Sequence, residues 1–198
     1  MPESPASPPP RPADRPASAR PTKAELAAAA SLTIPDVTAA DLRVLFSGIN
    51  PGLYSAATGH HFARPGNRFW PVLSASGFTS RQLRPDEQDE LPGLGLGITN
   101  VAARATARAD ELTPAELIEG GRILMAKLAK LRPGWLAVLG VTAYRTAFGS
   151  PGATVGPQPE VFHQTQVWVL PNPSGLNASY QIDRLAQEFA RLREAAAS

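Results

Sequence analysis

Four short apolar runs, separated by stretches with helical spacing, restrict the folds open to this chain. Each run is rich in β-branched or large apolar residues and is bounded by Gly, Pro or Asn, as buried strands commonly are. The runs are residues 43–47, 96–101, 135–140 and 166–171. Strands that alternate with helices usually form a mainly parallel sheet that is covered on both faces. The sequence therefore predicts an α/β fold, a three-layer α/β/α sandwich around a short, mainly parallel sheet of four to five strands.

Three stretches of the chain place their apolar side chains at helical spacing. In one of them Thr113 and Glu116 form the Thr-x-x-Glu pattern of a capping box, with Pro114 at the first helical position. In another, the spacing of Phe69 and Trp70 favours burial in the core over contact with a ligand. The predicted helices are residues 67–76, 114–131 and 180–197.

The first 38 residues differ in composition from the rest of the chain. They contain nine prolines and few large apolar residues, so they bury too little surface to offset the entropy lost on ordering. We expect residues 1–38 to be a disordered, basic, Pro/Ala-rich tail, with a short helix at residues 23–30. We interpret the tail as a solubilising extension, and contact with a polyanion is the alternative. Residues 39–198 are expected to form one domain.

The composition excludes several classes of chemistry. The chain has no cysteine, which rules out disulfides, cysteine-ligated zinc, iron–sulfur clusters and thiol catalysis. It has no apolar run near the roughly 20 residues of a membrane span, and its N-terminus lacks the apolar core of a secretion signal. We therefore expect a cytoplasmic protein that makes no membrane contact. The net charge of +2 permits nucleic-acid binding without requiring it.

Two segments rich in Asn, Pro and Gly follow the first and the last predicted strands. They are Ser47-Gly48-Ile49-Asn50-Pro51-Gly52 and Asn172-Pro173-Ser174-Gly175-Leu176-Asn177. Ligands of open α/β sheets bind outside the carboxyl ends of the strands, so both segments are expected to face one crevice. The amide of Asn50 can hold a water molecule in line for attack. The first segment is predicted to be an active site and the second a clamp, although an Asn-Pro-Gly turn alone can be purely structural.

A polar, glycine-rich segment, residues 58–70, carries further candidates. Phe62 precedes the predicted helix and is better placed to stack on a planar ring than the aromatic residues within the helix. His60 and His61 are candidates for a general acid or a phosphate contact, and a surface role is the alternative. Two adjacent histidines with no carboxylate nearby make a poor metal site. We therefore expect neither a metal nor another cofactor.

Four motifs, taken together and in this order, resemble those of the mismatch-specific uracil/thymine-DNA glycosylases of the uracil-DNA glycosylase superfamily. The motifs span residues 48–52, 62–70, 97–100 and 172–176. The resemblance covers about residues 42–192 and implies a uracil-DNA glycosylase-like fold. It also implies a monomeric, monofunctional enzyme of base-excision repair, nucleoid-associated by function. Such an enzyme flips uracil, thymine or another modified base out of mismatched duplex DNA and hydrolyses the N-glycosidic bond, leaving an abasic site.

The resemblance assigns roles around the base. Asn50 matches the residue that positions the attacking water, backbone groups of Ile49 and Gly52 match those that read the uracil edge, and Phe62 matches the stacking ring. Asn100, in the third motif, is assigned to the substrate pocket. Related uracil-specific enzymes carry a bulky tyrosine where Gly52 stands, so this pocket is expected to admit thymine or larger pyrimidine adducts.

The second Asn/Pro/Gly segment is assigned to the DNA. Leu176 matches the side chain that enters the gap left by the flipped base, where an apolar wedge replaces lost stacking. Asn172 is expected to contact the pocket or the flipped nucleotide, while Ser174, Gly175 and Asn177 are expected to contact the DNA, in part through phosphate. Taken alone, Leu176 would be interpreted as a core residue at a helix start. The expected partner is double-stranded DNA that contains uracil or mismatched bases.

The chain departs from the family pattern at two positions. Ala178 stands where bacterial relatives usually carry an arginine that contacts the orphaned guanine, which puts a preference for that base in doubt. Ala103 stands where family members tend to carry an acidic residue. Asp110 and Glu111 are the nearest replacements, and a carboxylate near the sugar can stabilise positive charge or activate water. We predict Asp110 as the catalytic carboxylate, with an ordinary solvated pair as the alternative.

The resemblance leaves one alternative function, a non-catalytic DNA-damage-binding module of the same fold. The presence of Asn50 argues against it, because a protein that only binds needs no amide beside the sugar. A nucleotide-processing enzyme is a third hypothesis. It would need a Gly-rich phosphate loop with lysine or a carboxylate cluster for a metal, and the sequence has neither pattern.

Overall fold

The computed structural model describes residues 20–177 and 180–197, so residues 1–19 of the predicted tail and Ala178 lie outside it. Five strands form one sheet in the order β2-β1-β3-β5-β4. Neighbouring strands run parallel except β4 and β5, which are antiparallel. The strands are β1 (Val44–Gly48), β2 (Leu96–Asn100), β3 (Trp135–Leu139), β4 (Gly156–Phe162) and β5 (Thr165–Leu170). The predicted mainly parallel sheet is confirmed.

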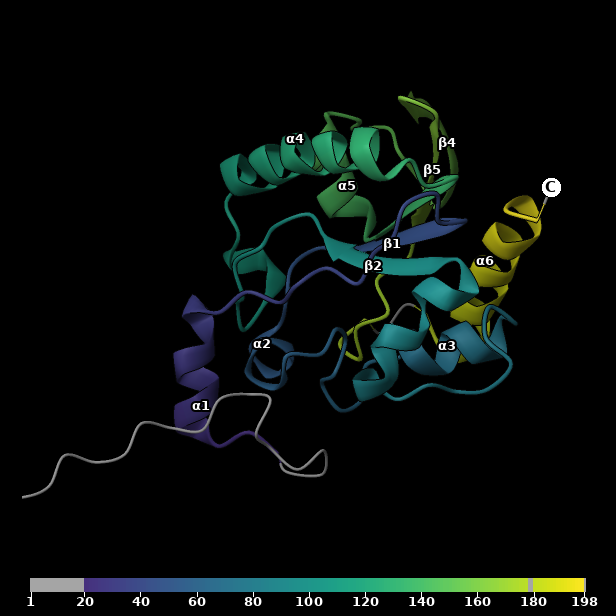
Figure 1. Cartoon of the computed structure of the whole chain (residues 1–198). Coiled ribbons are helices and arrows are strands. Elements are labelled where there is room, and N and C mark those ends of the chain that lie inside the picture. Colours follow the sequence, from purple (N-terminus) through teal and green to yellow (C-terminus); the bar gives the residue numbers. More distant parts are fainter. Residues whose placement is uncertain (1–19, 178–179, 198) are drawn as a thin grey trace, which may run out of the picture.

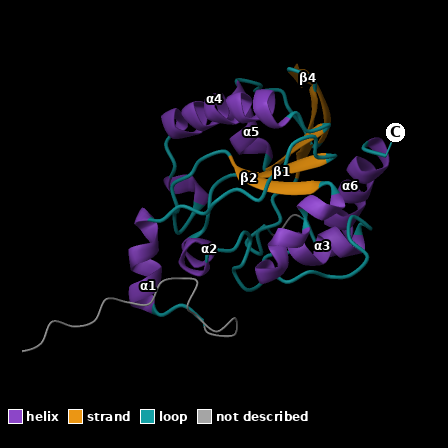
Figure 2. Ribbon diagram, in the orientation of Figure 1, coloured by secondary structure: helices purple, strands orange, loops and turns teal. Residues whose placement is uncertain are grey.

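Helices cover both faces of the sheet (Figures 1 and 2). The helices α4 (Pro114–Leu131) and α5 (Val141–Phe148) lie on one face, and α3 (Phe69–Ala75) and α6 (Ile182–Ala195) lie on the other. Successive strand residues point to opposite faces, so each side has its own apolar core. This arrangement confirms the predicted three layers. Within the described part of the chain, no helix has both the length and the apolarity to cross a bilayer.

The remaining helical segments among the described residues are short. Two are α-helices, α1 (Lys23–Ala28) and α2 (Leu53–Thr58), and four are 3-10 turns: η2 (Ala29–Ser31), η3 (Pro85–Glu90), η4 (Pro92–Leu94) and η5 (Ala109–Glu111).

The helix α4 begins where the capping box predicted. The Glu116 backbone N–H donates to the Thr113 hydroxyl at 3.2 Å, and the Thr113 backbone N–H donates to the Glu116 carboxylate at 2.9 Å. A Cβ at Gly120 would lie 2.2 Å from the carbonyl oxygen of Val101. Glycine therefore lets α4 pack directly against the backbone that follows β2, where the candidate site lies.

Residues 20–38 differ from the predicted disorder. The short helix expected at residues 23–30 is confirmed by α1, and the segment after it packs on the domain. Val37 forms an antiparallel bridge with Ile98 of β2, and the Lys127 ammonium lies 2.6 Å from the Asp36 carboxylate. The expectation of disorder was therefore wrong for these residues. A few apolar and charged side chains among them contact distant parts of the domain, and the overall composition of the segment does not reveal such contacts.

Besides the 3-10 turns, one strand and two short helices were not predicted from the sequence. The edge strand β4 contains Pro157 and Pro159, which argue against a strand interior but are tolerated at an edge. Its register against β5 shifts between Pro157 and Val161. The helices α2 and α5 span 6 and 8 residues, which is too short for a helical period to stand out.

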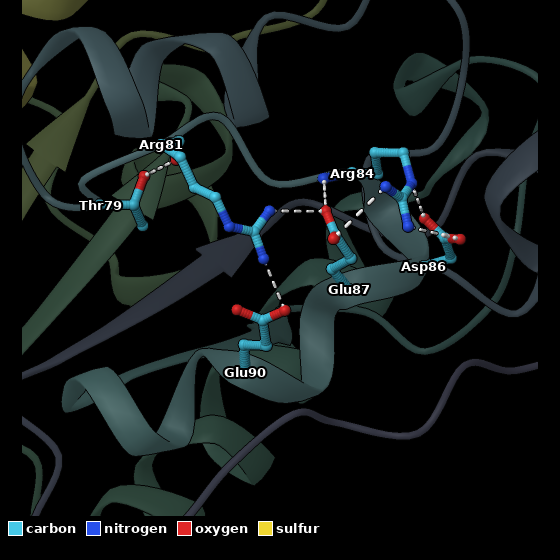
Figure 3. Close-up of polar contacts among 6 residues, drawn as sticks. All are labelled: Thr79, Arg81, Arg84, Asp86, Glu87 and Glu90. Atoms are coloured by element: carbon cyan, nitrogen blue, oxygen red, sulfur yellow. Dashed lines mark hydrogen bonds and ion pairs between the residues drawn. The ribbon is translucent and has the colours of Figure 1, made fainter.

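A network of surface ion pairs holds the segment between α3 and β2 (Figure 3). The Arg81 guanidinium lies 3.0 Å from the Glu87 carboxylate and 2.7 Å from that of Glu90, while Arg84 lies 3.0 Å from Asp86. Exposed ion pairs contribute little one at a time. Here they converge on the η3 turn, whose Gln88 side chain accepts a hydrogen bond from the backbone N–H of His61, a residue that lines the candidate site.

Candidate functional site

A cavity of about 140 Å³ lies at the carboxyl ends of the strands, where both Asn/Pro/Gly segments meet. A cavity near 150 Å³ is enough for one six-membered ring. The predicted site residues that line it are Ile49, Asn50, Gly52, Phe62, Asn100, Asn172, Ser174 and Leu176. Asp110, Gly175 and Asn177 lie outside the lining. The fold thus brings together two segments that are more than 100 positions apart in the sequence.

Hydrogen bonds fix the orientation of the Asn50 side chain. Its Nδ2 donates to the Arg104 carbonyl oxygen at 2.8 Å and to the Thr106 hydroxyl at 2.7 Å. The Thr106 hydroxyl in turn donates to the Arg108 carbonyl oxygen at 2.7 Å. Because a carbonyl oxygen only accepts, the nitrogen of the amide must face Arg104. The Asn50 amide oxygen is therefore left to accept a hydrogen bond, and a fixed acceptor can hold a water molecule in line for attack.

The loop that carries Asn50 is paired along its length with the chain after β2. The Val101 N–H donates to the Gly48 carbonyl oxygen at 2.9 Å, and the Thr106 N–H donates to that of Pro51 at 3.1 Å. A parallel bridge then joins Gly52 to Thr106. These contacts extend the pairing of β1 with β2 beyond the sheet and make the loop rigid.

Glu116 supports this loop from the start of α4. The Arg104 Nε donates to its carboxylate at 2.6 Å, and the Arg104 Nη2 donates to the Glu111 carbonyl oxygen at 3.0 Å. The Arg104 guanidinium, followed by the backbone N–H of Thr113, lowers the pKa of Glu116 to about 2. The carboxylate therefore stays ionised at physiological pH and holds the residue whose carbonyl orients Asn50.

Asp110 lies beside the cavity wall. Its side chain is 62% exposed, and one carboxylate oxygen accepts from the Nε of Arg108 at 3.0 Å. Arg108 lines the cavity. Glu111 accepts from the Arg108 backbone N–H at 2.9 Å and caps η5. A catalytic role for Asp110 stays a prediction, while Ala103 lines a different hollow.

The Phe62 ring lines one wall of the cavity and is backed by a second aromatic ring. The Phe62 ring stacks on Phe69, with centroids 4.2 Å apart. Phe69 and Trp70 are buried, as their helical spacing predicted. A Cβ at Gly48 would lie 3.2 Å from the Phe62 ring and 2.5 Å from the amide oxygen of Asn100. Only glycine at this position leaves both side chains in place.

The second Asn/Pro/Gly segment presents an apolar side chain to solvent. Leu176 is 72% exposed, so the alternative of a core residue is excluded. The Asn172 side chain accepts from the Ser174 N–H at 2.9 Å, and the Asn177 side chain donates to the Asn172 carbonyl oxygen at 2.9 Å. Both asparagines fold the segment into a tight turn with Leu176 at its tip.

Arg68 joins this segment to the rest of the site, a role that the sequence analysis missed. Its guanidinium donates to the carbonyl oxygen of Asn177 at 2.8 Å and to those of Ser174 and Tyr180. Its backbone N–H donates to the Pro173 carbonyl oxygen at 3.0 Å. Arginine suits this position because its planar group carries five donors. The available sequence signal was an arginine directly before an aromatic helix.

A second hollow of about 610 Å³ lies beside α4 and shares Ile34, Pro51 and Asn100 with the first cavity. Two of its basic groups are paired with acidic neighbours, Lys127 with Asp36 and Arg104 with Glu116. We take the smaller cavity as the functional site because the anchored amide of Asn50 lines it. In the described ranges, no three His, Asp or Glu side chains gather closely enough to hold a metal ion.

Comparison with known protein families agrees with this geometry. The family model described as "Uracil DNA glycosylase superfamily" matches residues 35–195. The members of that superfamily are DNA glycosylases, which are hydrolases that act on DNA. The match includes both Asn/Pro/Gly segments, and it begins at Pro35, in the ordered N-terminal segment.

Proposed function

Because this chain belongs to the uracil DNA glycosylase superfamily, we propose that it is a monofunctional, monomeric glycosylase of the mismatch-specific uracil/thymine type. It removes uracil, and also thymine or other modified bases, from mismatched duplex DNA. The observation that carries the proposal is the anchored amide of Asn50 on the wall of a cavity sized for one ring.

The proposed reaction is hydrolysis of the bond between base and sugar. The extruded base enters the cavity and stacks on Phe62, which brings the sugar C1′ near Asn50. As the bond lengthens, its electron pair leaves with the base and the sugar becomes oxocarbenium-like. A water molecule held by the Asn50 amide oxygen then adds to C1′ and loses a proton. Asp110, close to the cavity wall, is the proposed carboxylate that stabilises the positive charge and accepts this proton or passes it to solvent, and the departed base anion takes up a proton from solvent.

Gly52 supports a broad choice of bases. A Cβ at this position would have no other atom within 4 Å, and the backbone φ of −74° suits any residue. Glycine is therefore not demanded by the fold, and it leaves space in the pocket. Backbone groups of Ile49 and Gly52, together with Asn100 and Asn172, are proposed to contact the base or its nucleotide.

Leu176 supports the proposed opening of the duplex. An exposed apolar side chain at the tip of a tight turn is suited to fill the gap left by an extruded base. Ser174, Gly175 and Asn177 surround it and are proposed to contact the DNA backbone. Arg64 and Arg108, which line the cavity, are proposed to contact the flanking phosphates, although Arg108 also pairs with Asp110.

A nicking assay tests the proposal. Labelled duplexes with one G·U, G·T or A·U pair are incubated with excess protein in chelator and then heated in alkali, which breaks the strand at an abasic site. We expect cleavage at the uracil and, more slowly, at the thymine, with none in an undamaged duplex. Binding of the uracil duplex without any cleavage would instead indicate the non-catalytic module.

A further inference from the structure

His61 is buried against the ordered N-terminal segment. Its side chain is 2% exposed, and its Nε2 lies 2.9 Å from the Pro35 carbonyl oxygen. Its backbone N–H donates to the Gln88 side chain at 2.8 Å, and its carbonyl oxygen accepts from the Trp70 indole at 3.0 Å. Because the Pro35 oxygen only accepts, Nε2 must carry a hydrogen. The fold therefore selects one tautomer of the neutral imidazole.

This tautomer determines how the Asn100 amide is oriented. With the hydrogen on Nε2, the neutral ring has a bare Nδ1 that accepts. The Asn100 amide group lies 3.4 Å from this Nδ1, so the atom that faces it must be the donor, Nδ2. The amide oxygen then lies on the other side, beside Gly48 and Phe62, which line the cavity. The cavity thereby receives a hydrogen-bond acceptor.

We propose that His61 is a positioning residue that makes Asn100 present an acceptor to the base, and that the Pro35 carbonyl sets the tautomer of His61. The inference rests on the proposed function and deepens it. An acceptor at this wall matches bases with a ring N–H, such as uracil, thymine and hypoxanthine. Cytosine and adenine carry a bare ring nitrogen at the equivalent edge, so two acceptors would face each other.

Charges around His61 bear on this arrangement. Burial is the main influence and lowers its pKa below 6.5, and the neighbouring His60 and Lys127 act in the same direction. The Pro35 carbonyl and the Asp36 carboxylate oppose them. The neutral ring therefore prevails at pH 7. In acid, Nδ1 gains a hydrogen and faces the Asn100 Nδ2 as a second donor, so the amide must turn and present its NH₂ group to the cavity.

The tautomer is measured in the DNA-free protein by long-range ¹H–¹⁵N NMR of its three histidines. We expect His61 to be neutral at pH 7 with its hydrogen on Nε2, and to gain a second hydrogen only below its ordinary pKa of 6.5. A hydrogen on Nδ1, or a cationic ring at pH 7, would overturn the proposal whether or not the protein is a glycosylase.

Two variants test the effect on the base. His61→Asn places an oxygen near the Nδ1 position and cannot titrate, while His61→Leu removes the acceptor. On single-stranded DNA with one uracil, we expect His61→Leu to lose about tenfold or more in single-turnover rate, the size of effect given by one unsatisfied buried group. The wild-type rate should fall in acid, because His61 gains a second hydrogen and Asn100 turns. His61→Asn should stay within a few-fold of wild type at pH 7 and should not show this fall.

The matched control is His163→Asn, in the turn between β4 and β5, which should keep the wild-type rate and acid profile. A wild-type rate for His61→Leu, or an unchanged acid decline in His61→Asn, would refute the proposal. If His61→Leu does not fold, the acid profile of His61→Asn decides whether the proposal stands. If the wild type removes no uracil at all, the proposed function fails, and the NMR measurement still decides the inference about His61.

Discussion

The two Asn/Pro/Gly loops at the cavity are built in opposite ways. The loop with Asn50 is paired with the segment after β2, and its side chain makes two hydrogen bonds to fixed groups. The loop with Leu176 is held at its base by Arg68 and leaves its tip 72% exposed. Holding a water in line requires an immobile group, whereas filling a gap in a duplex requires a side chain that projects. The difference indicates a division of labour between chemistry and DNA opening.

The sheet topology explains this difference. The strand β1 lies between β2 and β3, so the loop that follows it has a neighbouring segment to pair with. The strand β5 lies next to the edge strand β4, which runs in the opposite direction. The chain after β5 therefore leaves the sheet without a parallel neighbour on that side, and a side chain, Arg68, supplies the contacts that hold it.

Replacing the immobile side chain should have the largest effect. Asn50→Ala is expected to reduce single-turnover excision of uracil by roughly 10² or more, the scale on which lost positioning or electrostatic groups act. Binding to the uracil duplex should stay nearly intact. Rates measured with excess protein, alongside affinity by fluorescence anisotropy, check both parts. An equal loss of binding and cleavage would mean that the Asn50 loop is structural.

Shortening the projecting side chain should have a smaller and more selective effect. We expect Leu176→Ala to slow excision about tenfold from an A·U duplex and hardly at all from a single strand, because only the duplex must be opened. Ile118→Ala is a matched control, since Ile118 of α4 is 56% exposed and lies outside the cavity lining. An equal loss of excision rate on both substrates would show that Leu176 is not a wedge. The proposed division of labour between the two loops would then be wrong.

The Asp110 carboxylate tests whether the Asn50 loop acts alone. We expect Asp110→Asn to slow excision several-fold on single and double strands alike, because it preserves shape and removes the charge near the sugar. Glu111→Gln is the comparison, since Glu111 caps η5. Full single-turnover rates in both variants would show that Asn50 works without a charged partner.

The smallest expected effect concerns the support behind the Asn50 loop. That support is the Glu116 carboxylate, which pairs with Arg104. The pairing lowers the pKa of Glu116 to about 2, against an ordinary value of 4.5. The ionised carboxylate therefore stabilises the fold fully above pH 4.5, and this contribution is lost as pH falls toward 2. Glu116→Gln should lower the Tm slightly at pH 7, since the pair is exposed, and the gap should close in acid. A gap that persists at pH 2 would point to a cause other than charge.

Local signals account for what the sequence predicted of the fold. The four parallel strands are apolar runs with clear boundaries, and the capping box marks the start of α4. The ordered part of the N-terminal segment was missed because its partners, including Ile98 and Lys127, lie far along the chain. The strand β4 was missed because its prolines are acceptable only at an edge, a position that no local pattern specifies.

The site also contains some residues that the sequence predicted and others that it did not. Motif residues such as Asn50 and Leu176 stand in short, recognisable segments, and the structure places both at the cavity. The sequence analysis missed Arg68 and Thr106, and it considered His61 only as a general acid, a phosphate contact or a surface residue, whereas His61 is buried. Each of the three acts mainly through backbone carbonyl groups of other segments. Every residue carries a backbone carbonyl group, so the residue type does not indicate which carbonyl will be the partner.

The edges of the sheet bear on how this protein behaves at high concentration. Pro157 and Pro159 in β4 have no N–H to offer to an incoming strand, and Val37 already pairs with Ile98 at the outer side of β2. Open strand edges template aggregation between molecules, and natural proteins block them with prolines or covering segments. Removing the N-terminal residues through Val37 would uncover the edge of β2, so a shortened chain should precipitate at concentrations that the full chain tolerates.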